Sequence, residues 1–487
     1  MKEGEKQVWY KALKAKDVRF DGRFFVGVSS TGIYCRPVCR AKLPKAENCI
    51  FFSTAAAAEQ AGFRPCLLCR PELAPGTSAV DATASLVHRA ARILEECCGS
   101  GQSLEELAAR LGCTSRHLRR AFTAEYNVSP VQYLQTCRLL LAKNLLTDTN
   151  LSVLDVAMAA GFGSLRRFND LFKKQYRLAP TALRRQTAEE KGQESTVTLA
   201  LGYRPPYQWQ QLLDFLAQRV IPGVEAVRNG EYWRTVRFVT GERRYVYGWV
   251  RVGHRPQKNT LTVTMSSSLL PVLPRVLARV RHLFDLYCDP DAVGKTLLSM
   301  NNIHPGLCVP GTRLPGCFDP FEMAVRAVLG QQITVKAAST LAARLVETYG
   351  TPVQTGIEGL THAFPRPEDI VVLDGPISNH LGPLGIIATR ANTILELARA
   401  FVQNAIDFGF CARPDVEMKK LMAIPGIGTW TAQYIAMRAM GWPDAFLQTD
   451  HGVKKALAPH TPKEILALAE EWRPWRSYAT ISLWNSL

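Results

Sequence analysis

The chain has 487 residues, too many for one ordinary hydrophobic core, which predicts about three or four domains. With 47% hydrophobic and 21% charged residues it has the composition of a globular protein, and no apolar run approaches the roughly 20 residues that span a bilayer. The net charge of +17 favours a polyanionic partner such as DNA or RNA. Charge alone does not separate nucleic acid from an acidic membrane; the absence of an anchor and the motifs below favour nucleic acid.

The polar N-terminal run MKEGEKQVWYKALKAK lacks the apolar core of a signal peptide, so we expect an intracellular, cytoplasmic protein without a membrane partner. If DNA is the partner, the protein is nucleoid-associated. Thirteen cysteines in a reducing compartment predict metal or thiol chemistry rather than disulfides.

Two short cysteine pairs lie near the N-terminus, Cys35 with Cys39 and Cys66 with Cys69. Each short turn delivers two sulfurs to one side of an ion, as a tetrahedral four-thiolate zinc site requires. Zinc is therefore the expected cofactor. Cys49 lies outside this spacing and is expected to be a small core residue. Four unrelated buried cysteines, or a zinc site that is only structural, are the alternatives.

The residues around these pairs resemble the N-terminal domain of the Ada adaptive-response regulators. The matching stretches are DGRFF (21–25), TGIYCRPVC (31–39) and GFRPCLLC (62–69). The resemblance implies a small zinc-bound α/β domain, which we place at 1–78. In that family the first cysteine of the first pair accepts a methyl group from a DNA methylphosphotriester. The resemblance gives this role to Cys35, which the spacing alone does not separate from the other three.

From residue 81 to about 186 the apolar residues recur at helical spacing in two similar units. In the first unit Gly112 breaks a helix and Thr114 starts the next, and in the second Gly161 and Ser164 do the same. Further matching positions are Phe122, Tyr126 and Pro130 in the first unit and Phe172, Tyr176 and Pro180 in the second.

This repeat resembles the AraC-type DNA-binding domain, an all-α tandem helix-turn-helix, which we place at 82–186. The second helices of the two units carry basic residues that could reach guanine edges or phosphates in the major groove: Arg116, Arg119, Arg166 and Arg167. The resemblance implies promoter DNA as a partner and, for an activator, RNA polymerase. A structural helix bundle with a solvated basic face is the alternative. Residues 187–195 are polar and are interpreted as a linker.

Beyond the linker, alternating apolar and polar residues predict strands of a small antiparallel sheet. The expected strands are 196–201, 245–251 and 260–265, with helices around 212–219 and 274–286. An α+β subdomain is therefore expected over 196–310.

Helical periodicity returns from Phe318, around the segment Pro425-Gly426-Ile427-Gly428. Glycines between two helices let the backbone approach a phosphate, and the next helix presents free N–H groups to it, as in a helix-hairpin-helix. An ordinary turn would have the same sequence. The downstream Asp450, in FLQTDHGVK, favours the first interpretation.

Hairpin and aspartate together resemble the helix-hairpin-helix glycosylase superfamily, and within it the AlkA-type 3-methyladenine DNA glycosylase II. The matching segments are YRPPYQW (203–209), FDLYC (284–288), LPGCFDPF (314–321), AVLGQQ (327–332) and WRPWRSY (472–478). The resemblance implies an all-α glycosylase domain over 311–487 that acts on alkylated double-stranded DNA.

Excision needs the damaged nucleotide flipped out of the duplex, because the glycosidic bond is unreachable inside the stack. Aromatic faces attract a cationic alkylated purine, and a carboxylate beside the sugar stabilises oxocarbenium-like charge and can orient water. Asp450 is the candidate carboxylate. Its alternative role is a helix N-cap, which is compatible with catalysis.

By resemblance, the pocket aromatics are Phe215, Trp430, Tyr434 and Trp484, each of which could equally be a core residue. Bifunctional members of the superfamily have a lysine in the hairpin motif, where this chain has Gly-Thr-Trp-Thr (428–431). A monofunctional enzyme that uses water is therefore expected.

Three departures from the AlkA type affect the expected substrate range. Gln332 stands where a leucine fills the gap left by the flipped base, His451 replaces a tyrosine, and the chain ends three residues after Trp484, which is expected to expose that ring. No Pro-Cys-His-Arg segment is present, so O6-alkylguanine repair is expected to be missing.

Taken in chain order, these units predict a multidomain α+β protein that fuses an alkylation-responsive regulator to a base-excising glycosylase. The alternative is a non-enzymatic DNA-binding regulator with a structural zinc and an inactive glycosylase half.

Overall fold

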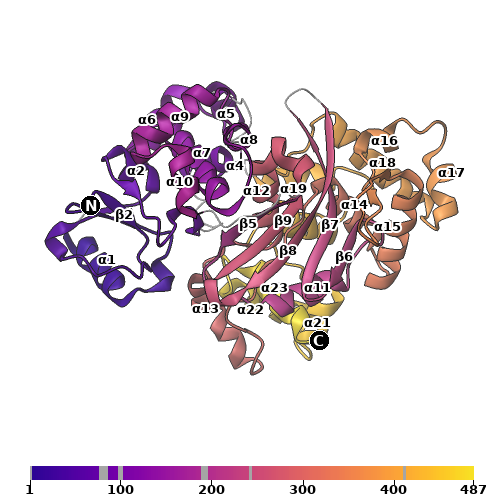
Figure 1. The fold of residues 1–487 in the computed structure, drawn as a ribbon. Coiled ribbons are helices and arrows are strands. Elements are labelled where there is room, and N and C mark those ends of the chain that lie inside the picture. Colours follow the sequence, from indigo (N-terminus) through magenta and orange to yellow (C-terminus); the bar gives the residue numbers. More distant parts are fainter. Residues whose placement is uncertain (1–2, 76–85, 97–102, 188–195, 241–243, 410–412) are drawn as a thin grey trace.

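The computed structural model describes residues 3–75, 86–96, 103–187, 196–240, 244–409 and 413–487 (Figure 1). A small sheet-and-helix region is followed by a helical region, a five-stranded sheet and a helical C-terminal region. The predicted multidomain α+β architecture is confirmed. The exact domain boundaries stay predictions, and the predicted linker lies, apart from Thr187, outside the described residues.

The N-terminal region, which we call the zinc domain, is built on a four-stranded sheet of order β3-β1-β2-β4. Strand β4 runs parallel to β2, with Tyr34 beside Pro65. Cys35 at the end of β2 therefore lies next to Cys66, which follows β4. The elements are α1 (Glu3–Ala15), β1 (Phe25–Val28), β2 (Ile33–Cys35), β3 (Cys49–Phe52), α2 (Ala55–Gln60) and β4 (Arg64–Pro65).

The second region is helical and contains the predicted repeat. Thr114 and Ser164 cap the second helix of each unit, accepting hydrogen bonds from the backbone of His117 and Arg167. Its helices are α4 (Leu86–Glu96), α5 (Leu104–Arg110), α6 (Ser115–Tyr126), α7 (Pro130–Asp148), α8 (Val153–Ala159), α9 (Leu165–Tyr176) and α10 (Pro180–Thr187).

The third region is an antiparallel sheet of order β5-β9-β8-β7-β6 with helices packed against it. The three predicted strands are present, and β6 and β7 form a further hairpin. The strands are β5 (Thr196–Gly202), β6 (Glu225–Arg228), β7 (Glu231–Val239), β8 (Tyr245–Arg255) and β9 (Thr260–Ser266). The helices are α11 (Trp209–Ala217), α12 (Leu273–Leu283) and α13 (Pro290–Leu297).

The C-terminal region is helical apart from a short two-stranded pair, β10 (Thr351–Pro352) and β11 (His362–Ala363). Among the described residues, no helix is both long and apolar enough to cross a membrane. The helices are α14 (Pro320–Leu329), α15 (Val335–Tyr349), α16 (Pro367–Val371), α17 (Ile377–Leu381), α18 (Ala388–Val402), α19 (Pro414–Met422), α20 (Thr429–Arg438), α21 (His451–Ala456), α22 (Pro462–Glu471) and α23 (Arg476–Asn485).

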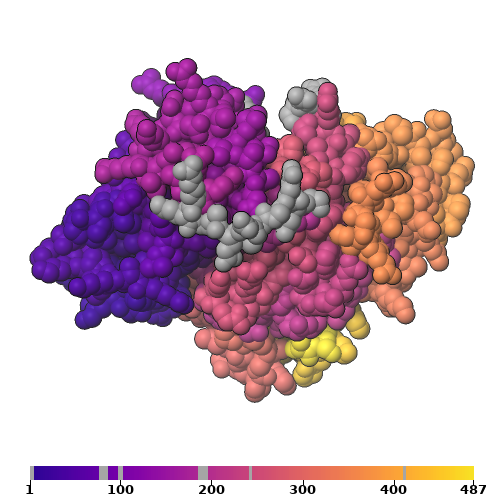
Figure 2. Space-filling model, viewed as in Figure 1, coloured from indigo at the N-terminus to yellow at the C-terminus, as the bar shows by residue number. Residues whose placement is uncertain are grey.

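One hydrophobic core runs through three regions. It joins Phe168 of α9, Val197 of β5 and Trp472 after α22, all of which are buried. A second core fills the space between α14, α15, α18 and α20. The space-filling view shows the zinc domain and the helical region lying directly against the sheet region (Figure 2). The first two regions and the last two are therefore packed against one another.

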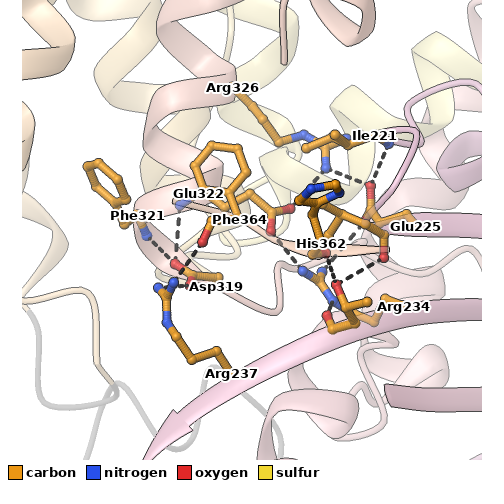
Figure 3. A network of polar contacts seen from close by, with 12 residues as sticks. Ile221, Glu225, Arg234, Arg237, Asp319, Phe321, Glu322, Arg326, His362 and Phe364 are labelled. Carbon is orange, nitrogen blue, oxygen red and sulfur yellow. Dashed lines mark hydrogen bonds and ion pairs between the residues drawn. The ribbon is translucent and has the colours of Figure 1, made fainter. Parts of the chain in front are cut away.

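A buried ionic network joins the sheet region to the C-terminal helices (Figure 3). Arg234 of β7 contacts Glu322 of α14 at 2.7 Å, and Arg326 of α14 contacts Glu225 of β6 at 2.9 Å. Two carboxylates and two guanidiniums balance in charge, which is the arrangement that makes buried ions tolerable.

Candidate functional site

Asp450 is held by three N–H donors. As the N-cap of α21 its Oδ1 accepts a hydrogen bond from the backbone of Val453 at 3.1 Å. The indole Nε1 of Trp484 donates to the same oxygen at 2.8 Å, and the indole Nε1 of Trp430 donates to Oδ2 at 3.1 Å. Capping and catalysis are thus geometrically compatible, and the half-buried carboxylate is fixed in orientation.

The four expected pocket aromatics gather around this carboxylate. Trp430 stacks on Tyr434 with ring centroids 5.3 Å apart, and Phe215 stacks against Trp484 at 6.2 Å. Tyr434 and Trp484 link the two pairs at 6.3 Å. Phe215 is buried while the other three rings are half-buried, so they present faces that a flat, electron-poor ring could contact.

The hairpin precedes α20, which carries Trp430. Gly426 has φ of +88°, and a Cβ there would lie 2.1 Å from Thr393 Oγ1, so this turn requires glycine. Gly428 is the exposed N-cap of α20 and has open space around it. Backbone N–H groups at this helix start are available to a phosphate.

The candidate wedge residue lies close to the hairpin. Gln332 is exposed in the turn between α14 and α15, with φ of +54°. Its neighbour Gln331 donates to Gly426 O at 2.9 Å and to Thr431 Oγ1 at 3.0 Å. The hairpin and the predicted wedge are therefore held as one unit.

In the zinc domain the four predicted cysteines converge. The sulfurs of Cys35, Cys39, Cys66 and Cys69 all lie within 4.8 Å of one another. A tetrahedral ion with bonds of about 2.3 Å places its sulfurs roughly 3.8 Å apart, so the donor set fits zinc. Cys49 is outside this cluster and half-buried, with its thiol donating to Lys45 O at 3.3 Å.

The predicted DNA-contacting arginines are exposed on the second helix of each repeat. Arg116 and Arg119 lie on α6, and Arg166 and Arg167 on α9. Arg119 also lies 3.9 Å from Glu105, a separation that is worth little on an exposed surface. All four side chains are free to meet a polyanion.

Models of four protein families match successive parts of the chain. They are the metal binding domain of Ada (8–72), a helix-turn-helix domain (107–186), the AlkA N-terminal domain (198–319) and the HhH-GPD superfamily base excision DNA repair protein (325–471). The chain is 37% identical to a probable bifunctional transcriptional activator/DNA repair enzyme AlkA of Mycobacterium tuberculosis, over 98% of this chain and 96% of that protein. The chain belongs to this family.

Two further relatives match the separate halves of this activator/repair protein. DNA-3-methyladenine glycosylase 2 of Escherichia coli is 37% identical, over 58% of this chain and 95% of that protein. The bifunctional transcriptional activator/DNA repair enzyme Ada of Escherichia coli is 38% identical, over 27% of this chain and 36% of that protein. The predicted fusion and the predicted zinc site are confirmed.

Two arginines of the activator/repair protein beside this aromatic cluster were not identified from the sequence. Arg219 lies over the face of Phe215 at 3.7 Å, and Arg438 donates to the Tyr434 hydroxyl at 2.9 Å. Burial alone would raise the pKa of Tyr434, but the guanidiniums of Arg438, Arg219 and Arg326 together lower it below its ordinary value. Each arginine follows its aromatic partner by one helical turn, which was the available signal.

Gly452 is a further position beside the candidate carboxylate that sequence reasoning missed. A Cβ on this residue would lie 2.8 Å from Trp484 Cδ1 and 3.1 Å from Asp450 Oδ1. Helix α21 therefore needs glycine here so that the indole of Trp484 can reach the carboxylate.

Proposed function

We propose that this activator/repair protein excises N-alkylated purines from double-stranded DNA by hydrolysis, with Asp450 as the essential carboxylate. The observation that carries this proposal is the position of Asp450, fixed by the indoles of Trp430 and Trp484 at the edge of an aromatic cluster. Its negative charge would stabilise the sugar cation that forms as the base leaves, and the carboxylate would orient the attacking water. A purine that already carries a positive charge needs little further protonation to leave.

The aromatic faces of Trp430, Tyr434, Trp484 and Phe215 would bind the flipped base. Gly426 and Gly428 would hold the DNA backbone at the hairpin, and Gln332 would fill the space left in the stack. Trp430 stands where bifunctional relatives carry an amine, so water is the nucleophile in this proposal.

The test is Asp450→Asn, which keeps a capping oxygen for Val453 but removes the charge. Release of 3-methyladenine from methylated duplex DNA should fall by at least about a hundredfold while DNA affinity is retained. Near-normal base release by Asp450→Asn would overturn the assignment and favour a glycosylase half that only grips DNA.

For the zinc domain we propose that Cys35 accepts a methyl group from a DNA methylphosphotriester. The thiolate attacks the methyl carbon, an S–C bond forms as the O–CH3 bond breaks, and the negative charge passes to the phosphodiester. Bound zinc would keep the sulfurs deprotonated at neutral pH. The four sulfurs would carry a formal charge of about −2 with the ion and about −1 after methylation.

Less negative charge beside a DNA backbone weakens repulsion, so we propose that methylation strengthens promoter binding through α6 and α9. Arg116, Arg119, Arg166 and Arg167 are the candidate contacts, and RNA polymerase is the proposed partner of the activated form, which would associate with the nucleoid. Mass spectrometry after incubation with methylphosphotriester DNA should find one methyl group on Cys35. Absence of the adduct would leave zinc with a structural role only. Equal promoter affinity before and after methylation at every salt concentration would instead refute the charge switch.

A further inference from the structure

The zinc domain and the glycosylase half meet backbone to backbone at Gly202, the last residue of β5. A Cβ on Gly202 would lie 1.9 Å from the carbonyl oxygen of Leu73. Leu73 belongs to the short 3-10 helix Pro71–Leu73, which begins two residues after Cys69. Only glycine allows two backbones to approach so closely, so the contact between the zinc domain and the glycosylase half depends on glycine at position 202.

Polar contacts hold a second segment of the zinc domain on the same surface. Arg204, which is 3% exposed, donates from Nε to the carbonyl oxygen of Asp21 at 3.1 Å and from Nη1 to Tyr287 O at 3.4 Å. Arg23 forms an ion pair with Asp289, the N-cap of α13. The segment around Asp21 is therefore held against the glycosylase half by a hydrogen bond from Arg204 and by the ion pair between Arg23 and Asp289.

The same aspartate also contacts the zinc site. The Asp21 carboxylate pairs with the guanidinium of Arg36, the residue that follows Cys35. Arg36 donates from Nη1 to Cys69 O at 3.1 Å and from its backbone N–H to Cys69 Sγ at 3.4 Å. Asp21 thus faces Arg36 with its side chain and Arg204 with its main chain.

Arg36 is stabilised in this largely buried position by negative charge on two sides. Its side chain is 14% exposed, its guanidinium pairs with the carboxylate of Asp21, and its backbone N–H donates to Cys69 Sγ in the sulfur cluster. Converting the Cys35 thiolate to a thioether removes one of those charges, which makes burial of the guanidinium less favourable. The buried position of Arg36, from which it contacts Asp21, is then less stable at the point where Asp21 is held by Arg204.

We propose that methylation of Cys35 loosens the Asp21–Arg36 contact and so releases the zinc domain from the glycosylase half. This rests on the methyl-acceptor role proposed above. In the unmethylated protein the zinc domain is docked, and after methylation it is free to follow the helix-turn-helix region onto DNA. Docking and methylation are linked reciprocally, as any pair of coupled equilibria must be.

Hydrogen–deuterium exchange on the zinc-loaded full chain tests the proposal. The protein is methylated with a methylphosphotriester duplex, separated from DNA at high salt, and compared with unmethylated protein. Peptides covering 18–24 and 287–293 should exchange at least about threefold faster after methylation. Gly202→Ala should exchange fast in both states, whereas Gly163→Ala, at a position with open space, should behave like the unchanged protein.

The Arg36→Gln variant tests the same coupling without methyl transfer, because it removes the guanidinium that contacts Asp21. It should show fast exchange in both segments without methylation, with zinc content retained. Slow exchange in Arg36→Gln, or unchanged exchange in protein whose mass shows the Cys35 adduct, would overturn the coupling and leave the methyl-acceptor role standing. Absence of the adduct would instead refute that role, and the coupling with it.

Discussion

Replacing Gly452 by alanine should damage the catalytic site without damaging the fold. The new Cβ would lie 2.8 Å from Trp484 Cδ1, where ordinary contact begins at 3.4 Å, so the indole must move by about 0.6 Å. Its hydrogen bond to Asp450, now 2.8 Å, would stretch to about 3.4 Å, outside the usual range of about 2.7–3.2 Å, and would be much weakened. Because the acceptor is a carboxylate, that bond is worth about 1.5–3 kcal/mol, or roughly 10- to 100-fold in rate.

Single-turnover release of 3-methyladenine from methylated duplex DNA measures this effect, and thermal unfolding reports the fold. Gly294→Ala is the matched control, since Gly294 is also helical, in α13, and a Cβ there meets nothing within 4 Å. The control should excise normally and gain up to about 1 kcal/mol of stability. If Gly452→Ala stays within twofold of the unchanged rate, the indole–carboxylate contact does not matter for catalysis.

Three other changes have definite expected outcomes. Trp484→Phe keeps a ring against Phe215 but loses the indole donor, so excision should fall about tenfold with DNA affinity unchanged in titrations; an unaltered rate would contradict this. Burial raises the pKa of Glu59 to about 8, so the native state keeps a proton that the unfolded chain releases. The free energy of unfolding should therefore fall by up to about 1.4 kcal/mol per pH unit between pH 5 and 8, and Glu59→Gln should flatten this slope in urea titrations. Removing zinc with a chelator should unfold residues 3–75, seen as lost circular dichroism, because no other cross-link holds the four sulfurs together in the described residues; a chelated protein with an unchanged spectrum would refute it.

The features that sequence could predict are those encoded locally. Each of these signals depends on residues a few positions apart. They are the spacing within each cysteine pair, the glycine before each second helix and the caps Thr114 and Ser164, and all of them are present in the structure. Asp450 could be selected because a hairpin motif precedes it. The hairpin of β6 and β7 was missed although Asn229 and Gly230, both with positive φ, are a common signal for a two-residue turn.

Features that depend on distant partners could not be predicted in this way. Glu225 and Arg234 break the alternation expected of half-buried strands, because their counter-charges come from α14 far along the chain. The hydrogen bond from Arg204 to the main chain of Asp21 joins residues 183 positions apart, and no periodic pattern in the sequence indicates it. Gly452 likewise is explained only by Trp484, which reaches it from the last helix.

The ionic network of Figure 3 bears on how this protein can be dissected. A chain cut at residue 310 would place Glu225 and Arg234 on one fragment and Glu322 and Arg326 on the other. Each fragment would expose an apolar surface and lose the Arg234–Glu322 and Arg326–Glu225 contacts, keeping only Arg234–Glu225 on one fragment and Arg326–Glu322 on the other. We therefore expect neither fragment to be soluble alone and both to reassemble when produced together, so a glycosylase assay needs the sheet region and the C-terminal helices in one chain.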